Sequence, residues 1–133
     1  MRIAMLAAAL VVAGCGSEAG GPCPDGGRFE RVDAPNGNWS EDCYIPNPDE
    51  SSLLRELRHG PRRSYYADGS PLTTQHWTHG VKAGLHLSYD EEGMVRRASC
   101  HNPSDGAAMW VMCESHNPCE ESEVLARECS STP

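Results

Sequence analysis

The strongest constraint on the fold of this chain is a sequence repeat with a period of 24 residues in its central part. The segment 60–69, GPRRSYYADG, aligns with the segment 84–93, GLHLSYDEEG. Four identities recur at the same offset: Gly60 with Gly84, Ser64 with Ser88, Tyr65 with Tyr89, and Gly69 with Gly93. A fixed period of this size is typical of a supersecondary unit that buries its apolar side only by stacking on its neighbour.

Each copy of the repeat has the pattern of a β-hairpin. An Asp-Gly or Glu-Gly turn signal follows an aromatic strand at 68–69 and at 92–93, and segments 72–77 and 94–100 supply the return strands. Thr78-His79-Gly80 then turns the chain into the next hairpin. We therefore predict a mainly β fold, a short antiparallel stack of hairpin repeats.

The repeated segments resemble MORN-variant repeats, in which an aromatic-plus-Gly strand alternates with an Asn/Asp-Gly turn and a Gly-x-x-x-Gly linker. Tyr65–Gly69 and His76–Gly84 carry the resemblance, and a decayed third unit is expected around Gly106–Met112. The chain is similar to myxobacterial-type lipoproteins that place a Cys-Pro…Pro…Gly…Cys module ahead of such repeats. Cys23-Pro24, Pro35, Gly37 and Cys43 match that module, and the whole resemblance covers about residues 23–100. The resemblance implies a binding or scaffolding role and brings no catalytic residues.

The N-terminal segment has the pattern of an export signal. Arg2 precedes the apolar run Ile3–Ala13, which is too short to span a membrane. Val12-Ala13-Gly14-Cys15 resembles the lipobox of bacterial lipoproteins. That resemblance implies removal of residues 1–14, acyl chains on Cys15, and a place in the cell envelope. Gly16, where an Asp would favour inner-membrane retention, favours the outer membrane. Ordinary secretion, with Cys15 a bystander, is the alternative.

The cysteine count agrees with lipidation. Once Cys15 is set aside, an even number remains: Cys23, Cys43, Cys100, Cys113, Cys119 and Cys129. An even set in an exported chain indicates three disulfides, but six cysteines allow about 15 connectivities. Proximity along the chain favours Cys23–Cys43, followed by Cys100–Cys113 and Cys119–Cys129.

The segment 15–22 is rich in Gly and is predicted to be a flexible tether. Segment 23–48 follows as a looped module closed by Cys23 and Cys43, with one short strand at 28–32. We expect Phe29 and Trp39 to fill it.

The repeat region is placed at 49–112, and its first ten residues are either a short helix or a strand. A disulfide-rich cap is expected at 113–133, with a short helix over 119–129. Asn117 would cap this helix, Val124 and Leu125 would face inward, and the helix would protect an edge strand.

The net charge limits the partners. The full chain carries −8, and loss of Arg2 leaves −9. Such an acidic chain argues against nucleic acid as a ligand, because phosphate binding relies on clustered Lys and Arg. The expected partners are the membrane, through lipid on Cys15, and an envelope protein or glycan of unknown identity. No cofactor is expected.

Two groups of residues have metal-ligand character. Cys113-x-x-His116-x-x-Cys119 has the spacing of a zinc site, although disulfides compete for its cysteines in an oxidising compartment. His76-x-x-His79 together with His86 forms a histidine group. The aromatic residues of the repeats either form a recognition surface or pack as core; they are Tyr65, Tyr66, Trp77, Tyr89 and Trp110.

No nucleophile motif stands out in the sequence. The favoured hypothesis is therefore a non-enzymatic, membrane-anchored lipoprotein that binds or scaffolds an envelope component. The alternative hypothesis is a periplasmic metal-binding lipoprotein that uses Cys113, His116 and Cys119.

Overall fold

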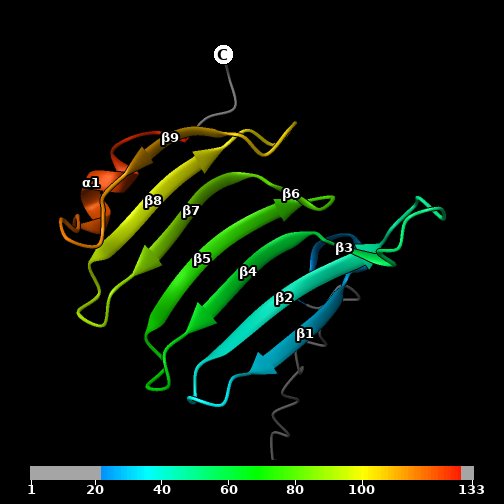
Figure 1. Ribbon diagram of the computed structural model, residues 1–133, viewed down its shortest axis with the longest axis horizontal. Coiled ribbons are helices and arrows are strands. Elements are labelled where there is room, and N and C mark those ends of the chain that lie inside the picture. Colours follow the sequence, from blue (N-terminus) through cyan, green and yellow to red (C-terminus); the bar gives the residue numbers. More distant parts are fainter. Residues whose placement is uncertain (1–21, 130–133) are drawn as a thin grey trace, which may run out of the picture.

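Both repeated hairpins form, and every strand joins one antiparallel sheet (Figure 1). The computed structural model describes residues 22–129. The strands are β1 (Arg28–Asp33), β2 (Trp39–Pro46), β3 (Glu56–Arg58), β4 (Gly60–Tyr65), β5 (Pro71–Thr78), β6 (Val81–Lys82), β7 (Gly84–Tyr89), β8 (Val95–His101) and β9 (Ala108–Met112). A 3-10 helix, η1 (Pro24–Gly26), precedes the sheet, and one helix, α1 (Glu121–Leu125), follows it. The predicted mainly β class is confirmed.

The sheet is an open meander in which each long strand lies beside the one before it. The order is β1-β2-β4-β5-β7-β8-β9, with β3 beside β2 and β6 beside β5 (Figure 1). β3 and β6 are short segments that run into β4 and β7, and Gly60 and Gly84 begin those longer strands with positive φ. The 24-residue period therefore covers a short strand, a long strand, a turn and a return strand.

The two copies share their irregularities as well as their strands. The β4–β5 ladder shifts register between Ser64 and Tyr65, and the β7–β8 ladder shifts between Ser88 and Tyr89. Both shifts have the form of a β-bulge, in which two residues of one strand oppose one residue of its partner. The identities that define the repeat thus lie at the start of its long strand, at its bulge and at its turn.

A third hairpin with the same turn lies at the N-terminus, where the sequence predicts a looped module. In all three turns a glycine amide donates to the carbonyl three residues earlier: Gly37 to Ala34 at 3.0 Å, Gly69 to Tyr66 at 2.9 Å, and Gly93 to Asp90 at 3.1 Å. The looped module is therefore wrong over residues 39–46, which form β2 and pair on both sides. The decayed unit expected at the C-terminus contributes only β9.

The segment between β2 and β3 is a loop, not a helix. Its turns are closed by side chains, as where Asp49 accepts from the amide and the hydroxyl of Ser51 at 3.0 and 2.6 Å. Leu53 is 99% exposed and Leu54 is also exposed. These leucines have helical spacing but pack against nothing. The helix predicted for residues 49–58 is therefore wrong, and the strand alternative is correct only for the three residues of β3.

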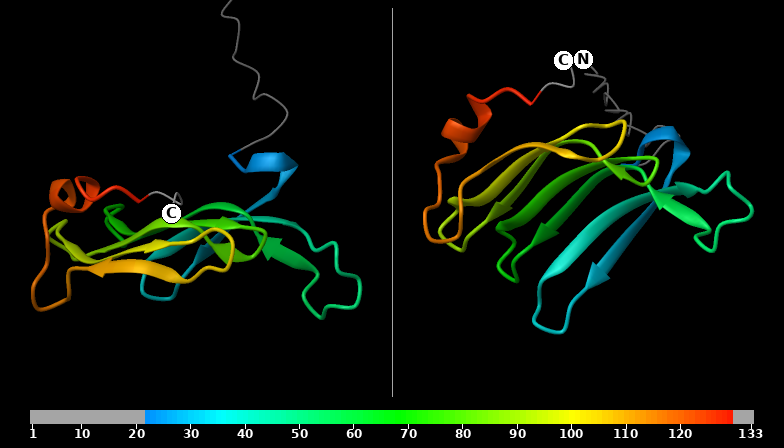
Figure 2. Two further views of the ribbon diagram at one scale, coloured as in Figure 1. Left: turned by 90° about the horizontal axis from the view of Figure 1, so that it is seen from above. Right: turned by 45° about the horizontal axis from the view of Figure 1, so that its top comes forward.

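The two faces of the sheet differ. η1 and α1 lie on the same side of it, here called the helix face; the opposite side is called the open face (Figure 2). The core lies under α1, where fully buried Val124 packs against Leu87, Tyr89, Val95 and Ala98. Alternation along each strand sends successive side chains to opposite faces, so half of the residues of β7 and β8 point to the open face.

α1 differs in detail from the predicted helix. It begins after Glu120, whose capping box with Glu123 replaces the expected cap at Asn117. Val124 is buried as predicted, but Leu125 is 58% exposed. The helix covers the face of the sheet beside β7 and β8 instead of an edge strand. Phe29, expected to fill the N-terminal module, is exposed.

The equivalent glycines Gly60 and Gly84 give a matched test of the fold. A Cβ at Gly60 would lie 2.6 Å from Cδ of Pro24, and φ there is +105°, whereas a Cβ at Gly84 would meet nothing within 4 Å at φ +66°. We expect Gly60→Ala to lower the free energy of unfolding by about 2 to 3 kcal/mol and Gly84→Ala by about 1 kcal/mol. Urea denaturation of both variants measures the difference, and equal losses would contradict the close approach of η1 to β4.

Candidate functional site

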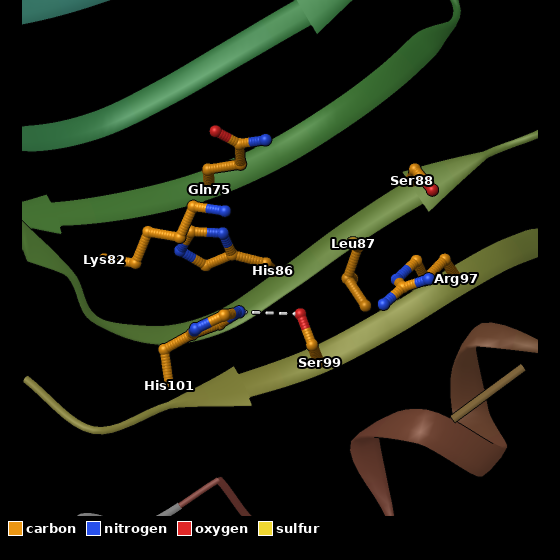
Figure 3. A pocket seen from close by; sticks show the side chains of 8 residues that line it. All are labelled: Gln75, Lys82, His86, Leu87, Ser88, Arg97, Ser99 and His101. Carbon is orange, nitrogen blue, oxygen red and sulfur yellow. Dashed lines mark hydrogen bonds between the residues drawn. The ribbon is translucent and has the colours of Figure 1, made fainter. Parts of the chain in front are cut away.

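A pocket with a cavity volume of about 170 Å³ lies on the open face across β5, β7 and β8, with β6 beside it (Figure 3). In the β7–β8 ladder His86 pairs with Ser99 and Ser88 pairs with Arg97. Because side chains alternate along a strand, these residues share one face. The polar side chains that line the pocket are Gln75, Lys82, His86, Ser88, Arg97, Ser99 and His101.

His101 is held in the pocket by two hydrogen bonds. Its Nδ1–H donates to the carbonyl oxygen of Gly106 at 2.8 Å. That bond fixes the tautomer of the neutral ring, so Nε2 accepts from the hydroxyl of Ser99 at 2.8 Å (Figure 3). Ser99 and His101 therefore form a connected pair on β8, with the ring orientation set by the loop that follows the strand.

His86 is the buried histidine of the pocket. Its side chain lies 4.6 Å from His101, measured between ring centroids, and its Nε2–H donates to the carbonyl of His76 at 3.0 Å. Burial lowers the pKa of His86 because it disfavours the charged ring. The bond to the His76 carbonyl raises this pKa, while positive charge on His101, Lys82 and His76 lowers it further.

The pocket carries positive charge, although the chain as a whole is acidic. Lys82 and Arg97 line it, and no carboxylate does. Within residues 22–129, neither of these cations makes an ion pair. Four arginines of the N-terminal half do have carboxylate partners, namely Glu56 for Arg28, Asp33 for Arg31, and Asp42 for Arg58 and Arg62.

Gln75 and Trp77 form the β5 side of this site. Nε1 of Trp77 points to Oε1 of Gln75 at 3.4 Å, a long contact that occupies the acceptor end of the amide. Nζ of Lys82 lies 5.9 Å from the Trp77 ring centroid. The groups left to face a ligand are therefore mainly donors: the Gln75 amide N–H groups, the Lys82 ammonium and the Arg97 guanidinium.

The structure corrects two of the three disulfide pairings favoured by proximity. Cys23–Cys43 is confirmed, but Cys100 pairs with Cys129, and Cys113 pairs with Cys119. Cys100 lies opposite Trp110 in the β8–β9 ladder. Cys113 is three residues farther along, about 10 Å at the rise of a strand, which is too far for a disulfide.

The proposed metal ligands at the C-terminus are not available as a set. Cys113 and Cys119 are bonded to each other, so neither sulfur can act as a thiolate ligand. His116 is exposed and lies 2.8 Å from the carboxylate of Glu114. No group of three potential ligands comes together in the part of the chain that the structure describes. The Cys113/His116/Cys119 hypothesis is therefore wrong for this disulfide-bonded form.

The predicted histidine group is divided between two places. The ring of His86 donates to the backbone carbonyl of His76, but alternation along β5 places the His76 side chain on the face opposite to Gln75 and the pocket. His79 lies in the turn between β5 and β6, with φ +48°, and its amide donates to Nδ1 of His59 at 3.1 Å. His59 is buried and its Nε2 lies 2.7 Å from the carboxylate of Asp25. This second cluster ties η1 to the sheet, and the sequence analysis did not identify its Asp25–His59 pair.

The aromatic residues of the repeats do not form one recognition surface. Tyr89 is buried in the core, and Trp110 packs against it. Tyr65 stacks on Trp39 with ring centroids 5.0 Å apart. Trp77, by contrast, is half-buried beside the pocket on the open face. Of the two roles considered for these rings, packing is therefore the main one, with Trp77 the exception.

Sequence reasoning missed the pocket, since it singled out only His86 among the residues that line it. The strand register would have placed Gln75, His86 and Ser99 on one face, and it follows from the hairpin turns. The lipidation site Cys15 lies outside the described residues.

Residues 22–129 contain no helix of the length and apolar character needed to cross a bilayer. Comparison of the chain with protein-family models, with curated proteins and with solved structures gives no match.

Proposed function

We propose that this chain is a non-enzymatic binding module, held on the envelope of a bacterial cell by lipid on Cys15. The observation that carries the proposal is the pocket on the open face, where several polar side chains converge beside Trp77. α1 and η1 both lie on the helix face, which leaves the pocket accessible to a partner (Figure 2). The lipobox at Val12–Cys15 supports the membrane anchor.

A binding role fits the lining better than a catalytic one. Ser99 and His101 have the relation of a nucleophile and its base. The other polar groups that line the pocket are the Lys82 and Arg97 cations, the Gln75 amide, Ser88 and His86, and the two cations suit a ligand with a standing negative charge. His101 donates its Nδ1–H to a backbone carbonyl, and no carboxylate lines the pocket to stabilise a charged ring, as it would in a catalytic triad. We therefore assign the Ser99–His101 pair to ligand binding.

The anchor is tested by fractionation of cells that produce the full chain. We expect the protein in the membrane fraction, and we expect Cys15→Ser to move most of it to the soluble fraction because the acylated thiol is lost. Ser17→Ala is the matched control, since it lies in the same tether and leaves the lipobox intact. An unchanged distribution of Cys15→Ser would contradict the anchor.

The binding role is tested with a photo-crosslinking residue at position 111 or at position 31 on the helix face. Val111 lies opposite Ser99 in the β8–β9 ladder, next to the pocket but outside its lining, so the pocket keeps Lys82. Both native residues are exposed, so neither substitution disturbs the core. We expect envelope partners to be captured from position 111 only. Equal capture from both positions would contradict the role of the open face, and covalent labelling of Ser99 by a fluorophosphonate would contradict the non-enzymatic assignment.

A further inference from the structure

The pocket on the open face concentrates positive charge in an acidic protein. The chain has 11 Lys and Arg against 19 Asp and Glu, yet two of its cations and two of its histidines line this one cavity. In the described part of the chain, Lys82 and Arg97 make no ion pair that would neutralise them. A cavity of this kind attracts anions, because its cations are left without a counter-charge.

The charged and amide groups of the pocket face a ligand mainly as donors. Arg97 and Lys82 only donate, and the acceptor end of Gln75 faces Trp77, which leaves the amide N–H groups free to donate. The Ser99 hydroxyl proton is used by His101. A ligand that accepts several hydrogen bonds would complete this set.

The size of the cavity limits the ligand to a small group. About 170 Å³ is well below the ~300 to 1,000 Å³ of sites that enclose a drug-sized molecule. A single tetrahedral oxyanion offers four acceptor oxygens in a small volume. Guanidinium and ammonium groups are the side chains that commonly bind such oxyanions.

We propose that this pocket binds a phosphate or sulfate group, free or as the ester of a larger envelope molecule. Arg97 and Lys82 would supply the charge, and the amide N–H groups of Gln75 would orient the oxygens. The proposal rests on the binding function proposed above and names the ligand class of the same site.

Binding is expected to strengthen as the pH falls. His86 is surrounded by His76 on β5, Lys82 on β6, and His101 and Arg97 on β8, with no carboxylate lining the cavity. Burial, His101, Lys82 and His76 lower the pKa of His86, and a bound oxyanion would raise it by attracting the charged ring. Anion binding should therefore be coupled to proton uptake by His86.

The test is a titration of the purified full chain, with disulfides intact, against sodium phosphate and against sodium sulfate at constant ionic strength. Histidine ring resonances in NMR spectra report on the site directly. We expect saturable shifts for His86 and His101 and weaker binding at pH 8 than at pH 6. Arg97→Gln or Lys82→Gln should weaken binding about tenfold, the loss expected for one charge-assisted contact.

Arg96→Gln is the matched control, since it removes the same charge from the adjacent exposed residue, which does not line the pocket. We expect it to change the affinity less than about twofold, as screening weakens distant exposed charges. Equal losses for the Arg96 and Arg97 variants, or shifts that do not saturate, would overturn the proposal. Unchanged spectra elsewhere in each variant would show that the fold is retained.

Two further arms identify the source of the oxyanion. One uses glucose 6-phosphate, and the other uses phosphatidylcholine vesicles with and without phosphatidic acid. Arg97-dependent binding in either arm supports the proposal and names the source as a sugar ester or a lipid. If phosphate fails to bind while crosslinks from position 111 persist, the ligand class is wrong and the binding function stands. If phosphate binds but Cys15→Ser leaves fractionation unchanged, only the anchor fails.

Discussion

Replacing Cys100 and Cys129 together by alanine is expected to lower the free energy of unfolding by about 3.5 kcal/mol. The two residues are 29 apart in sequence, and opening a loop of that length restores chain entropy to the unfolded state. A loss of this size is a large part of the ~5 to 15 kcal/mol that stabilises a small domain. Cys100 is fully buried on β8, so the bond also fixes the end of the chain to the centre of the sheet.

The same replacement should detach α1. The helix has only five residues, and an isolated helix of that length does not hold in water. It stays in place through burial of Val124 and through the disulfide that follows it. Its release would expose Leu87, Tyr89 and Val95, which form the core under it. We therefore expect increased binding of a hydrophobic dye together with the loss of stability.

Urea denaturation followed by tryptophan fluorescence measures this effect. The matched control replaces Cys113 and Cys119 by alanine, where the separation is only six residues and the expected loss is about 2.4 kcal/mol. Disulfide mapping of the wild-type protein by mass spectrometry tests the connectivity itself. A larger loss for the Cys113/Cys119 variant than for the Cys100/Cys129 variant would contradict the assigned roles.

Asp42→Ala is expected to cost about 2 to 3 kcal/mol of unfolding free energy. The side chain of Asp42 is 4% exposed, and its Oδ1 lies 3.2 Å from Nε of Arg58 and 3.2 Å from Nε of Arg62. Removing the carboxylate leaves both guanidinium groups without a counter-charge at a partly buried position. Arg58 also lies over the ring of Trp77, so the loss would reach the side of the pocket.

Two variants separate charge from packing at this position. Asp42→Asn keeps the shape and removes the charge, and we expect it to recover only a minor part of the lost stability. Asp33→Ala removes a carboxylate that is 71% exposed and paired with Arg31, and should cost less than about 0.5 kcal/mol. Equal costs for Asp33→Ala and Asp42→Ala in urea denaturation would contradict a stabilising role for the buried carboxylate.

Much of the fold follows from local sequence. The turns at Gly69 and Gly93 and the alternation around them specify two hairpins, because turn geometry depends on a few adjacent residues. The N-terminal hairpin has the same turn at Gly37 but escaped prediction. Its strands carry many charged residues, and the loop between β2 and β3 interrupts the regular spacing. The helical spacing of Leu53, Leu54 and Leu57 led to the incorrect prediction of a helix. Spacing alone does not stabilise a helix unless its apolar side packs against another element.

Less of the candidate site could be predicted from the sequence. Lys82, His86 and Arg97 belong to three different strands, and only the register between strands brings them to one pocket. Cys113, His116 and Cys119 have the spacing of metal ligands, but two cysteines at this spacing can also form a disulfide with each other, as they do here. The burial that lowers the pKa of His86 is likewise a property of the assembled sheet and not of any segment.

The sequence by itself determined the class of fold, the period of the hairpins and the number of cysteines available to pair, because these depend on local turn chemistry and on composition. The tertiary structure decided which C-terminal cysteines meet, which face α1 covers and which polar side chains share a pocket. These outcomes depend on where the chain after Cys119 returns over β8. That path is set by the burial of Val124 and by strand register, which act between residues far apart in sequence.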